Sequence, residues 1–197
     1  MAERRIAAAV LAAGQSRRFG AADKLAADLN GRPLGEYATS ALAGLPLAQR
    51  WVIAASADHP CAASWQASGF AIAVNDRAVE GMGTSLALAA SLAVEAGAEA
   101  LLIALADMPL VPASHFAALL ARGEVLGEAA LVASEADGQR SPPALFGRDR
   151  FALLAASGGD QGARHLLGAA QPVTCPPDWL IDIDDPAALA RLAARAL

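Results

Sequence analysis

The chain has 197 residues, of which 53 are alanine, and its 15 basic and 20 acidic side chains give a net charge of −5. This length fits one domain, expected over residues 1–197, and its longest apolar runs fall far short of the roughly 18 residues that a membrane-spanning helix needs. With no block of basic residues there is no electrostatic footprint for nucleic acid, so we expect neither a membrane nor a nucleic-acid partner.

Apolar runs of strand length alternate along the chain with segments of helical period. The predicted strands are Arg5–Ala13, Arg50–Ser56, Phe70–Val74, Leu101–Leu105 and Ala129–Ala133, and the predicted helices are Leu34–Ala43, Ser85–Ala96 and Ala113–Ala121. Continuously apolar strands are typical of a sheet that is buried on both faces, and this alternation predicts a parallel sheet between two layers of helices.

The C-terminal third interrupts that pattern. Asp137-Gly138 predicts a tight turn between two apolar segments, and therefore one antiparallel strand near the C-terminus. After Pro176-Pro177 we expect a last strand over Trp179–Ile183, and Asp185-Pro186 predicts a final helix with aspartate as its cap. The predicted fold is a single three-layer α/β/α domain with a mostly parallel sheet.

The loop after the first strand is rich in glycine and basic residues. Gly14 and Gly20 let the backbone turn tightly and present N–H groups to an anion, while Arg17, Arg18 and Lys24 add the positive charge that suits a polyphosphate. The loop is neither a Walker loop nor a dinucleotide-binding loop. From spacing alone, an ordinary surface loop with solvated arginines is the alternative.

Two later segments also follow or precede predicted elements at positions where ligands bind. Asp107 follows the strand Leu101–Leu105, where a carboxylate can hold Mg²⁺, although it could instead cap a turn. The segment Gly81–Leu86 could contact a ribose or base, or could form a helix start that is capped by Thr84 or Ser85.

The cysteines and the N-terminus bear on location. Cys61 and Cys175 are too few for a disulfide framework, so we predict reduced thiols and a cytoplasmic protein. The alanine-rich N-terminal run is a poor signal sequence, because Arg17 and Arg18 follow where a cleavage site should lie.

The loop after the first strand resembles the signature of the Rossmann-like nucleotidyltransferases. Residues 11–20 have the pattern Leu-Ala-Ala-Gly-x-Ser-x-Arg-x-Gly, and Lys24 follows. Leu105–Pro109, which reads Leu-Ala-Asp-Met-Pro, is similar to the metal-binding motif of that family. The resemblance implies that Arg17 and Lys24 are catalytic and neutralise phosphate charge. The nucleotide-binding residues that it implies are Leu11, Ala12, Ala13, Gly14, Gln15, Ser16, Lys24, Gly83 and Ser85.

Segments of the C-terminal third resemble the molybdenum cofactor cytidylyltransferases and their close relatives. They are Asp137–Arg140, Pro143–Arg148, Gly159–Arg164 and Ile181–Pro186. The resemblance implies that Asp184 joins Asp107 in holding Mg²⁺, with Asp182 as the rival because alternate strand residues share a face. Arg140 and Arg164 are the candidates for binding the acceptor. Ser141-Pro142 departs from the usual Arg-Gly-x-Pro of the family, so the sequence indicates the nucleotide chemistry more firmly than the identity of the acceptor.

The function that this resemblance implies is transfer of CMP from CTP to the phosphate of molybdopterin-type molybdenum cofactor, with release of pyrophosphate. The product would serve an enzyme of the xanthine dehydrogenase type, handed over directly or by an insertion chaperone. Ala13, where guanylyltransferases commonly carry glycine, favours CTP over GTP. The alternatives are a guanylyltransferase for the same cofactor, a transferase for another small phosphorylated acceptor, and a non-catalytic cofactor carrier.

Overall fold

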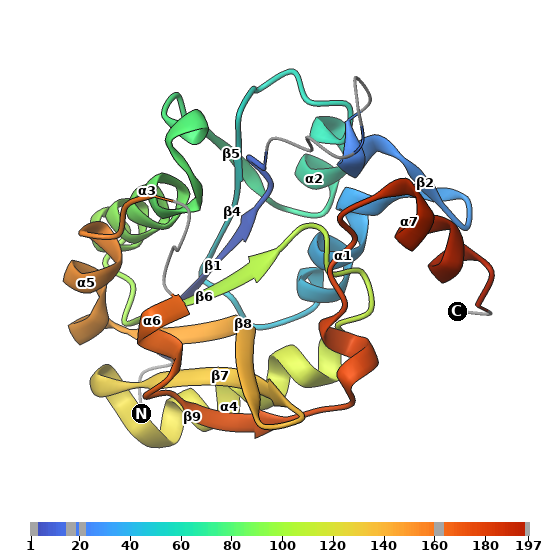
Figure 1. Ribbon diagram of the computed structural model, residues 1–197. Helices are drawn as coiled ribbons and strands as arrows, with labels where there is room; N and C mark the ends of the chain where they lie inside the picture. Colours follow the sequence, from blue (N-terminus) through green and yellow to red (C-terminus); the bar gives the residue numbers. More distant parts are fainter. Residues whose placement is uncertain (1–3, 15–18, 20–22, 160–163, 196–197) are drawn as a thin grey trace.

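A seven-stranded sheet forms the middle of the molecule, in the order β5-β4-β1-β6-β8-β7-β9 (Figure 1). The computed structural model describes residues 4–14, 19, 23–159 and 164–195. The strands are β1 (Ile6–Leu11), β4 (Gln49–Ala54), β5 (Ala71–Val74), β6 (Ala100–Leu105), β7 (Leu131–Ala136), β8 (Gln139–Gly147) and β9 (Gln171–Thr174).

The sheet is mostly parallel, as predicted. Strands β5, β4, β1 and β6 run parallel to one another, and β9 runs parallel to β7, whereas β8 is antiparallel to both β6 and β7. The β7–β8 turn consists of Asp137 and Gly138, with φ values of 50° and 74°. Two consecutive positive φ values are what a two-residue hairpin turn requires, so the predicted Asp-Gly turn is confirmed.

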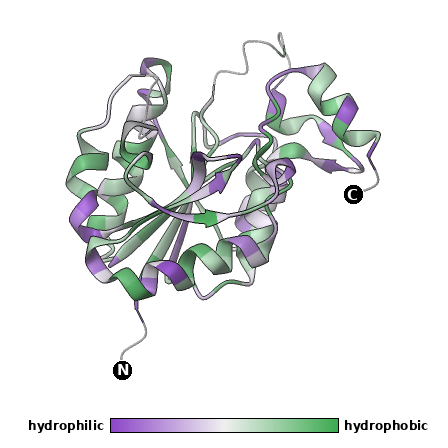
Figure 2. Cartoon of the chain, turned by 60° about the horizontal axis from the view of Figure 1, so that its bottom comes forward, coloured by the Kyte–Doolittle hydropathy of each residue, from purple (hydrophilic) through white to green (hydrophobic). Residues whose placement is uncertain are grey.

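Helices cover both faces of the sheet. They are α1 (Tyr37–Ala43), α2 (Ala62–Ala67), α3 (Met82–Glu95), α4 (Ala113–Leu126), α5 (Phe151–Ala155), α6 (Arg164–Leu167) and α7 (Pro186–Ala193). Helices α3, α5 and α6 pack on one face, over Ala7 and Ala9 of β1, and α1, α2 and α4 pack on the other, over Ala8 and Val10. The helices carry both green and purple segments in Figure 2, as expected when one side faces the sheet and the other faces water;. This arrangement confirms the three-layer prediction.

Shorter elements connect these layers. A two-stranded hairpin is formed by β2 (Asp28–Leu29) and β3 (Arg32–Pro33), and α7 lies beside it in Figure 1. The 3₁₀ turns are η2 (Lys24–Ala26), η3 (Leu34–Glu36), η4 (Ala78–Glu80), η5 (Gly127–Ala129), η6 (Arg148–Arg150) and η7 (Pro177–Leu180). Within the described residues, none of the helices is long and apolar enough to cross a membrane.

The predicted last strand over Trp179–Ile183 is wrong. Residues Pro177–Leu180 form η7, and the N–H of Trp179 donates to the carbonyl of Pro176 at 3.1 Å. Two successive prolines fix φ near the value of a turn and donate no ladder hydrogen bonds, which favours this turn over a strand. The final helix is confirmed, because Asp185 accepts from the N–H of Ala188 at 2.7 Å and Pro186 is the first helical residue.

Candidate active site

The carboxyl ends of β1 and β6 lie side by side, so the segments that follow the two strands leave the sheet at the same edge. The two strands pair in register from Ile6 with Ala100 to Leu11 with Leu105, and the N–H of Ala106 still donates to the carbonyl of Leu11 at 3.1 Å. Parallel α/β sheets bind their ligands beyond this edge. The glycine-rich loop therefore starts beside the segment that carries Asp107.

Three charged side chains converge at this edge. The Nζ atom of Lys24 lies 2.7 Å from Oδ2 of Asp107 and 3.4 Å from Oδ1 of Asp184. The side chain of Lys24 is only 10% exposed, against 22% for Asp107 and 48% for Asp184. A buried ammonium is stable when it is paired, and here it is paired with carboxylates from two distant parts of the chain.

Lys24 owes its position to a short turn. It is the first residue of η2, and Asp23 caps this turn by accepting the N–H of Leu25 at 2.8 Å. The capped turn fixes the backbone from which the Lys24 side chain extends toward Asp107.

Asp184 is brought to the site by a backbone hydrogen bond. The N–H of Ile183 donates to the carbonyl of Asp107 at 3.0 Å, and the Ile183 side chain is fully buried. This bond fastens the segment before α7 to the loop after β6. Residues on either side of Ile183 are thereby held next to Asp107.

Asp182 belongs to the same group of acidic residues. Loss of surrounding water raises the pKa of its carboxyl, and the negative charges of Asp184 and Asp107 raise it further. The contact with Lys24, however, is made by Asp184. Whether Asp184 or Asp182 joins Asp107 in holding a metal stays a prediction.

The residues present fit a divalent cation that is completed by substrate. Asp107 and Asp184 both face one point of positive charge, and Mg²⁺ is commonly held by one or two carboxylates together with phosphate oxygens and water;. Across the described ranges there is no group of three or more His, Cys, Asp or Glu side chains arranged around a metal position. Metal binding by Asp107 and Asp184 stays a prediction.

The expected nucleotide-binding residues at the end of β1 are present at the edge of the sheet. Leu11, Ala12 and Ala13 are buried, and Gly14 has open space around the position that a side chain would take. Gln15, Ser16 and Arg17 lie outside the described residues, as does Arg18, which occupies the arginine position of the pattern.

Gly83 and Ser85 are engaged within the protein. The N–H of Gly83 donates to the carbonyl of Gly159 at 3.0 Å, and the hydroxyl of Ser85, which is 4% exposed, accepts from Nδ2 of Asn75 at 2.9 Å. Helix α3 begins at Met82 with Gly81 as its cap, so neither Thr84 nor Ser85 caps it as the alternative had it. Nucleotide contact by Gly83 and Ser85 stays a prediction.

Asn75 is a buried polar residue after a strand end that the sequence reasoning did not single out. It follows β5 directly, is buried, and donates to the hydroxyls of both Thr84 and Ser85 at 2.9 Å. The available signal was a polar residue immediately after a predicted strand, the same kind of position that Asp107 occupies.

The two candidate acceptor-binding arginines differ in what the structure describes. Nε of Arg140 lies 3.4 Å from Oε2 of Glu135, and the guanidinium also donates to the carbonyl of Gly168. Arg164 begins α6, and its side chain lies outside the described part of the chain. Acceptor binding by either residue stays a prediction.

Comparison with known proteins places this site in a family. The family model of the MobA-like NTP transferase domain matches residues 8–173, which include most of β1, Lys24 and Asp107, but not Asp184. The chain belongs to the MobA-like NTP transferase family. It is 31% identical to the purine catabolism protein PucB of Bacillus subtilis (strain 168) over 173 residues, covering 82% of this chain and 80% of that protein.

One more relative by sequence and one by structure are similar to this chain. It is 31% identical over 166 residues to the molybdenum cofactor guanylyltransferase of Cereibacter sphaeroides, covering 82% of this chain and 78% of that protein. It also superposes on the crystal structure of a mycobacterial homologue (Mycobacterium sp. strain JC1) of Mycobacterium tuberculosis Rv0371c. The TM-score is 0.77 and the identity 26%, with 98% of this chain and 97% of that chain covered. The predicted nucleotidyltransferase fold is thus confirmed over nearly the whole chain.

Proposed function

We propose that this MobA-like NTP transferase transfers CMP from CTP to the terminal phosphate of molybdopterin-type molybdenum cofactor and releases pyrophosphate. The observation that carries the proposal is the convergence of Lys24, Asp107 and Asp184 beside the glycine-rich loop. A triphosphate needs a cationic side chain and metal-binding carboxylates at one place, and the chain brings them there from three separated segments.

The reaction is one displacement at phosphorus. An oxygen of the acceptor phosphate forms a bond to the α-phosphorus of the nucleotide as the bond from that phosphorus to the bridging oxygen breaks, and pyrophosphate leaves with the bonding electrons. No covalent enzyme intermediate is needed, so the protein contributes positioning and charge stabilisation. Lys24 and Arg17, with Arg18 beside it, would face the negative charge that develops on the phosphates.

Asp107 and Asp184 would hold a divalent ion such as Mg²⁺, which supplies Lewis-acid stabilisation of phosphate oxygens when bound. The ammonium of Lys24 already contacts both carboxylates. It keeps them from repelling one another before substrate enters. Once a triphosphate is bound, the same ammonium can turn to a phosphate oxygen.

The choice of CTP rests on Ala13. This residue is 8% exposed and lies two residues beyond the end of β1, directly before Gly14, where the glycine-rich loop starts. A methyl group where guanylyltransferases commonly have glycine leaves less room for a purine. GTP is the second candidate, because the C. sphaeroides relative is named a guanylyltransferase.

The acceptor and the recipient follow from the same resemblance. The C. sphaeroides relative is named for the molybdenum cofactor, which supports this cofactor as the acceptor. The B. subtilis relative is named for purine catabolism, and this supports a recipient of the xanthine dehydrogenase type, since such enzymes oxidise purines. A non-catalytic carrier is disfavoured, because binding the cofactor alone requires no Lys24–Asp107–Asp184 set.

The test is incubation of the purified protein with molybdenum cofactor, Mg²⁺ and CTP, with release of pyrophosphate and formation of the cytidylylated cofactor measured together. Both products should appear in equal amounts and only when all components are present. Absence of both products with CTP and with GTP would refute the proposed transfer to this cofactor.

A further inference from the structure

The loop between β4 and α2 places a histidine against the turn that carries Lys24. Nε2 of His59 lies 2.8 Å from Oδ2 of Asp23, and the His59 side chain is only 8% exposed. Asp23 directly precedes Lys24 and caps η2 through its other carboxylate oxygen. His59 thus contacts the residue that directly precedes the lysine of the site.

The protonation pattern of His59 is set by its other contact. The backbone N–H of Cys61 donates to Nδ1 of His59 at 3.0 Å. Because Nδ1 is an acceptor, the neutral ring carries its proton on Nε2, which is buried 2.8 Å from the Asp23 carboxylate but is not aligned with it for a hydrogen bond;. Among the described residues Nε2 has no hydrogen-bond partner, so the Asp23 carboxylate is the acceptor within its reach.

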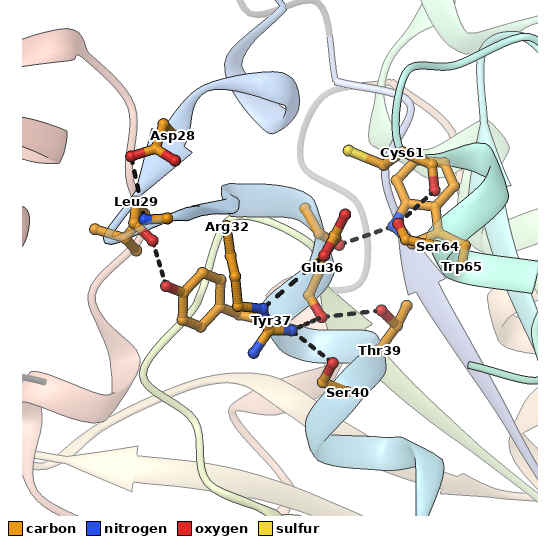
Figure 3. Close-up of polar contacts among 12 residues, drawn as sticks. Asp28, Leu29, Arg32, Glu36, Tyr37, Thr39, Ser40, Cys61, Ser64 and Trp65 are labelled. Carbon is orange, nitrogen blue, oxygen red and sulfur yellow. Dashed lines mark hydrogen bonds and ion pairs between the residues drawn. The ribbon is translucent and has the colours of Figure 1, made fainter. Parts of the chain in front are cut away.

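The His59 ring also stacks on an aromatic side chain. His59 stacks on Trp65 with a centroid separation of 4.5 Å and an angle of 23° between the rings. Trp65 is fully buried, and its Nε1–H donates to the carbonyl of Gly35 at 2.8 Å (Figure 3). Figure 3 also shows that Arg32 donates a hydrogen bond to Ser40 and that the hydroxyl of Tyr37 donates one to the carbonyl of Leu29. Trp65 therefore lies in a region that is rich in hydrogen bonds.

We propose that His59 is a positioning residue for the nucleotidyl transfer, acting through Asp23 to hold Lys24 toward Asp107 and the triphosphate. This inference rests on the proposed function, because Lys24 matters in it as a phosphate-binding group. The chain of contacts runs from Trp65 through His59 and Asp23 to the first residue of η2. An ammonium displaced from the phosphates loses much of its effect, and misplacement of about 1 Å can cost roughly 100-fold in rate.

Two substitutions separate the polar role of His59 from its packing role. His59→Phe keeps a ring on Trp65 but removes the nitrogen that lies 2.8 Å from Asp23. His59→Gln gives up the ring but retains an amide N–H at a similar reach. Both variants lose the acceptor for the Cys61 N–H, so this loss is common to the comparison.

The measurement is binding of Mg·CTP and Mg·GTP by calorimetry, together with kcat and KM for transfer. His59→Phe should weaken binding of the preferred triphosphate and lower kcat by about 10- to 100-fold, whereas His59→Gln should stay within a few-fold of the parent. In a Lys24→Ala background, His59→Phe should cause no further loss of binding. Equal effects of both variants, no effect of His59→Phe, or a full additional loss without Lys24 would each overturn the proposal.

A second variant covers the case in which His59→Phe does not fold. Asp23→Asn keeps an oxygen for the Leu25 N–H but can turn an amide donor toward the His59 N–H, so it should weaken triphosphate binding in the same way. Unchanged binding by a folded Asp23→Asn protein would overturn the proposal. A parent that binds triphosphate but transfers no nucleotide would refute the proposed function alone, while the binding comparison would still decide the role of His59.

Discussion

At the scale of single residues, the two carboxylates that face Lys24 are central to the site. Asp107→Asn keeps the size of the side chain but removes the charge that a divalent cation needs, and Asp184 still pairs with Lys24. We expect transfer to fall by about 100- to 1,000-fold, as for other deletions of electrostatic stabilisation. Steady-state kinetics at saturating Mg²⁺ would measure this loss.

The matched control for that substitution is Asp149→Asn. Asp149 is an exposed carboxylate in η6, just after the end of β8 that pairs with the start of β6, and thus at the opposite edge of the sheet. It should retain parental turnover. Near-parental turnover by Asp107→Asn as well would remove Asp107 from the mechanism.

Lys24 differs from an ordinary loop lysine because it is buried between its partners. Lys24→Ala leaves Asp107 and Asp184 facing each other with like charges, so we expect a loss of about 1–2 kcal/mol in the free energy of unfolding without divalent ions. Mg²⁺ should reduce this loss by supplying the missing positive charge. Chemical denaturation with and without Mg²⁺ would measure both effects.

Arg77→Ala is the control for this prediction, because the Arg77–Glu80 pair lies on the exposed surface and should contribute no measurable stability;. If Lys24→Ala were as stable as the parent in the absence of Mg²⁺, the like-charge argument would be wrong.

His115 gives the protein a pH dependence that is separate from the site. Burial lowers the pKa of His115, whose Nε2 lies 2.8 Å from Oγ of Ser134. As pH falls below the ordinary value of 6.5, the unfolded chain takes up this proton before the folded chain does. The free energy of unfolding should therefore decrease as pH drops below about 6.5, because the unfolded state then binds more protons.

Denaturant titrations of the parent and of His115→Gln between pH 5 and pH 8 would isolate this contribution. The parent should lose more stability toward pH 5 than the variant does. Parallel pH profiles for the two proteins would contradict the assignment.

At the scale of elements, the contact between α3 and the segment after α5 is unusually close. A Cβ atom on Gly83 would lie 2.6 Å from the backbone of Gly158. The nearest atoms are all backbone atoms, so the clash could be relieved only by a shift of the main chain. Gly83→Ala should push the segment around Gly158 away, lowering stability by about 1–3 kcal/mol. It should also weaken transfer, since this segment leads toward Arg164.

Gly44→Ala is the matched control for thermal unfolding and kinetics. Gly44 has φ of −86° and no atom within 4 Å of the position that a Cβ atom would take, so alanine should fit without loss. Parental stability of Gly83→Ala would show that the two segments can separate freely.

The elements also show which parts of the fold are readable from sequence. The strands of the parallel sheet are predictable to within a few residues, because each forms one apolar run. Strands β1, β4 and β6 are largely buried on both faces, whereas the edge strand β5 is partly exposed;. The Ile-Asp-Ile-Asp alternation over residues 181–184 is typical of a strand, but Ile183 bonds to the loop that carries Asp107 instead of to a ladder. The alternation arises because the buried side chain of Ile183 lies between the exposed residues Asp182 and Asp184, and no strand is formed.

At the scale of the whole molecule, motifs predict that Asp107 and Asp184 share one site, and the fold brings both to Lys24. The burial of Lys24 and its support by His59 are not predictable from sequence, since both depend on side chains from separate loops meeting in space. Asn75 was missed although its place directly after a predicted strand was a visible signal. Local pattern therefore predicts the sheet, whereas these tertiary contacts appear only in the folded chain.

Nucleotide choice is also set by the whole site. One methyl group at Ala13 can discriminate by about 10- to 200-fold at most, so the preference for CTP over GTP should lie within that range. UTP should be rejected through hydrogen bonding, because it lacks the amino donor of cytosine and would leave a buried acceptor unpaired.

The most direct measurement is a competition assay with CTP, GTP and UTP at equal concentration, in the presence of Mg²⁺ and molybdenum cofactor, scored by the nucleotide joined to the cofactor. We expect cytidylylated cofactor as the main product, with pyrophosphate released in equal amount. A predominance of guanylylated cofactor would overturn the nucleotide assignment, and the absence of any nucleotide on the cofactor would contradict the proposed function itself.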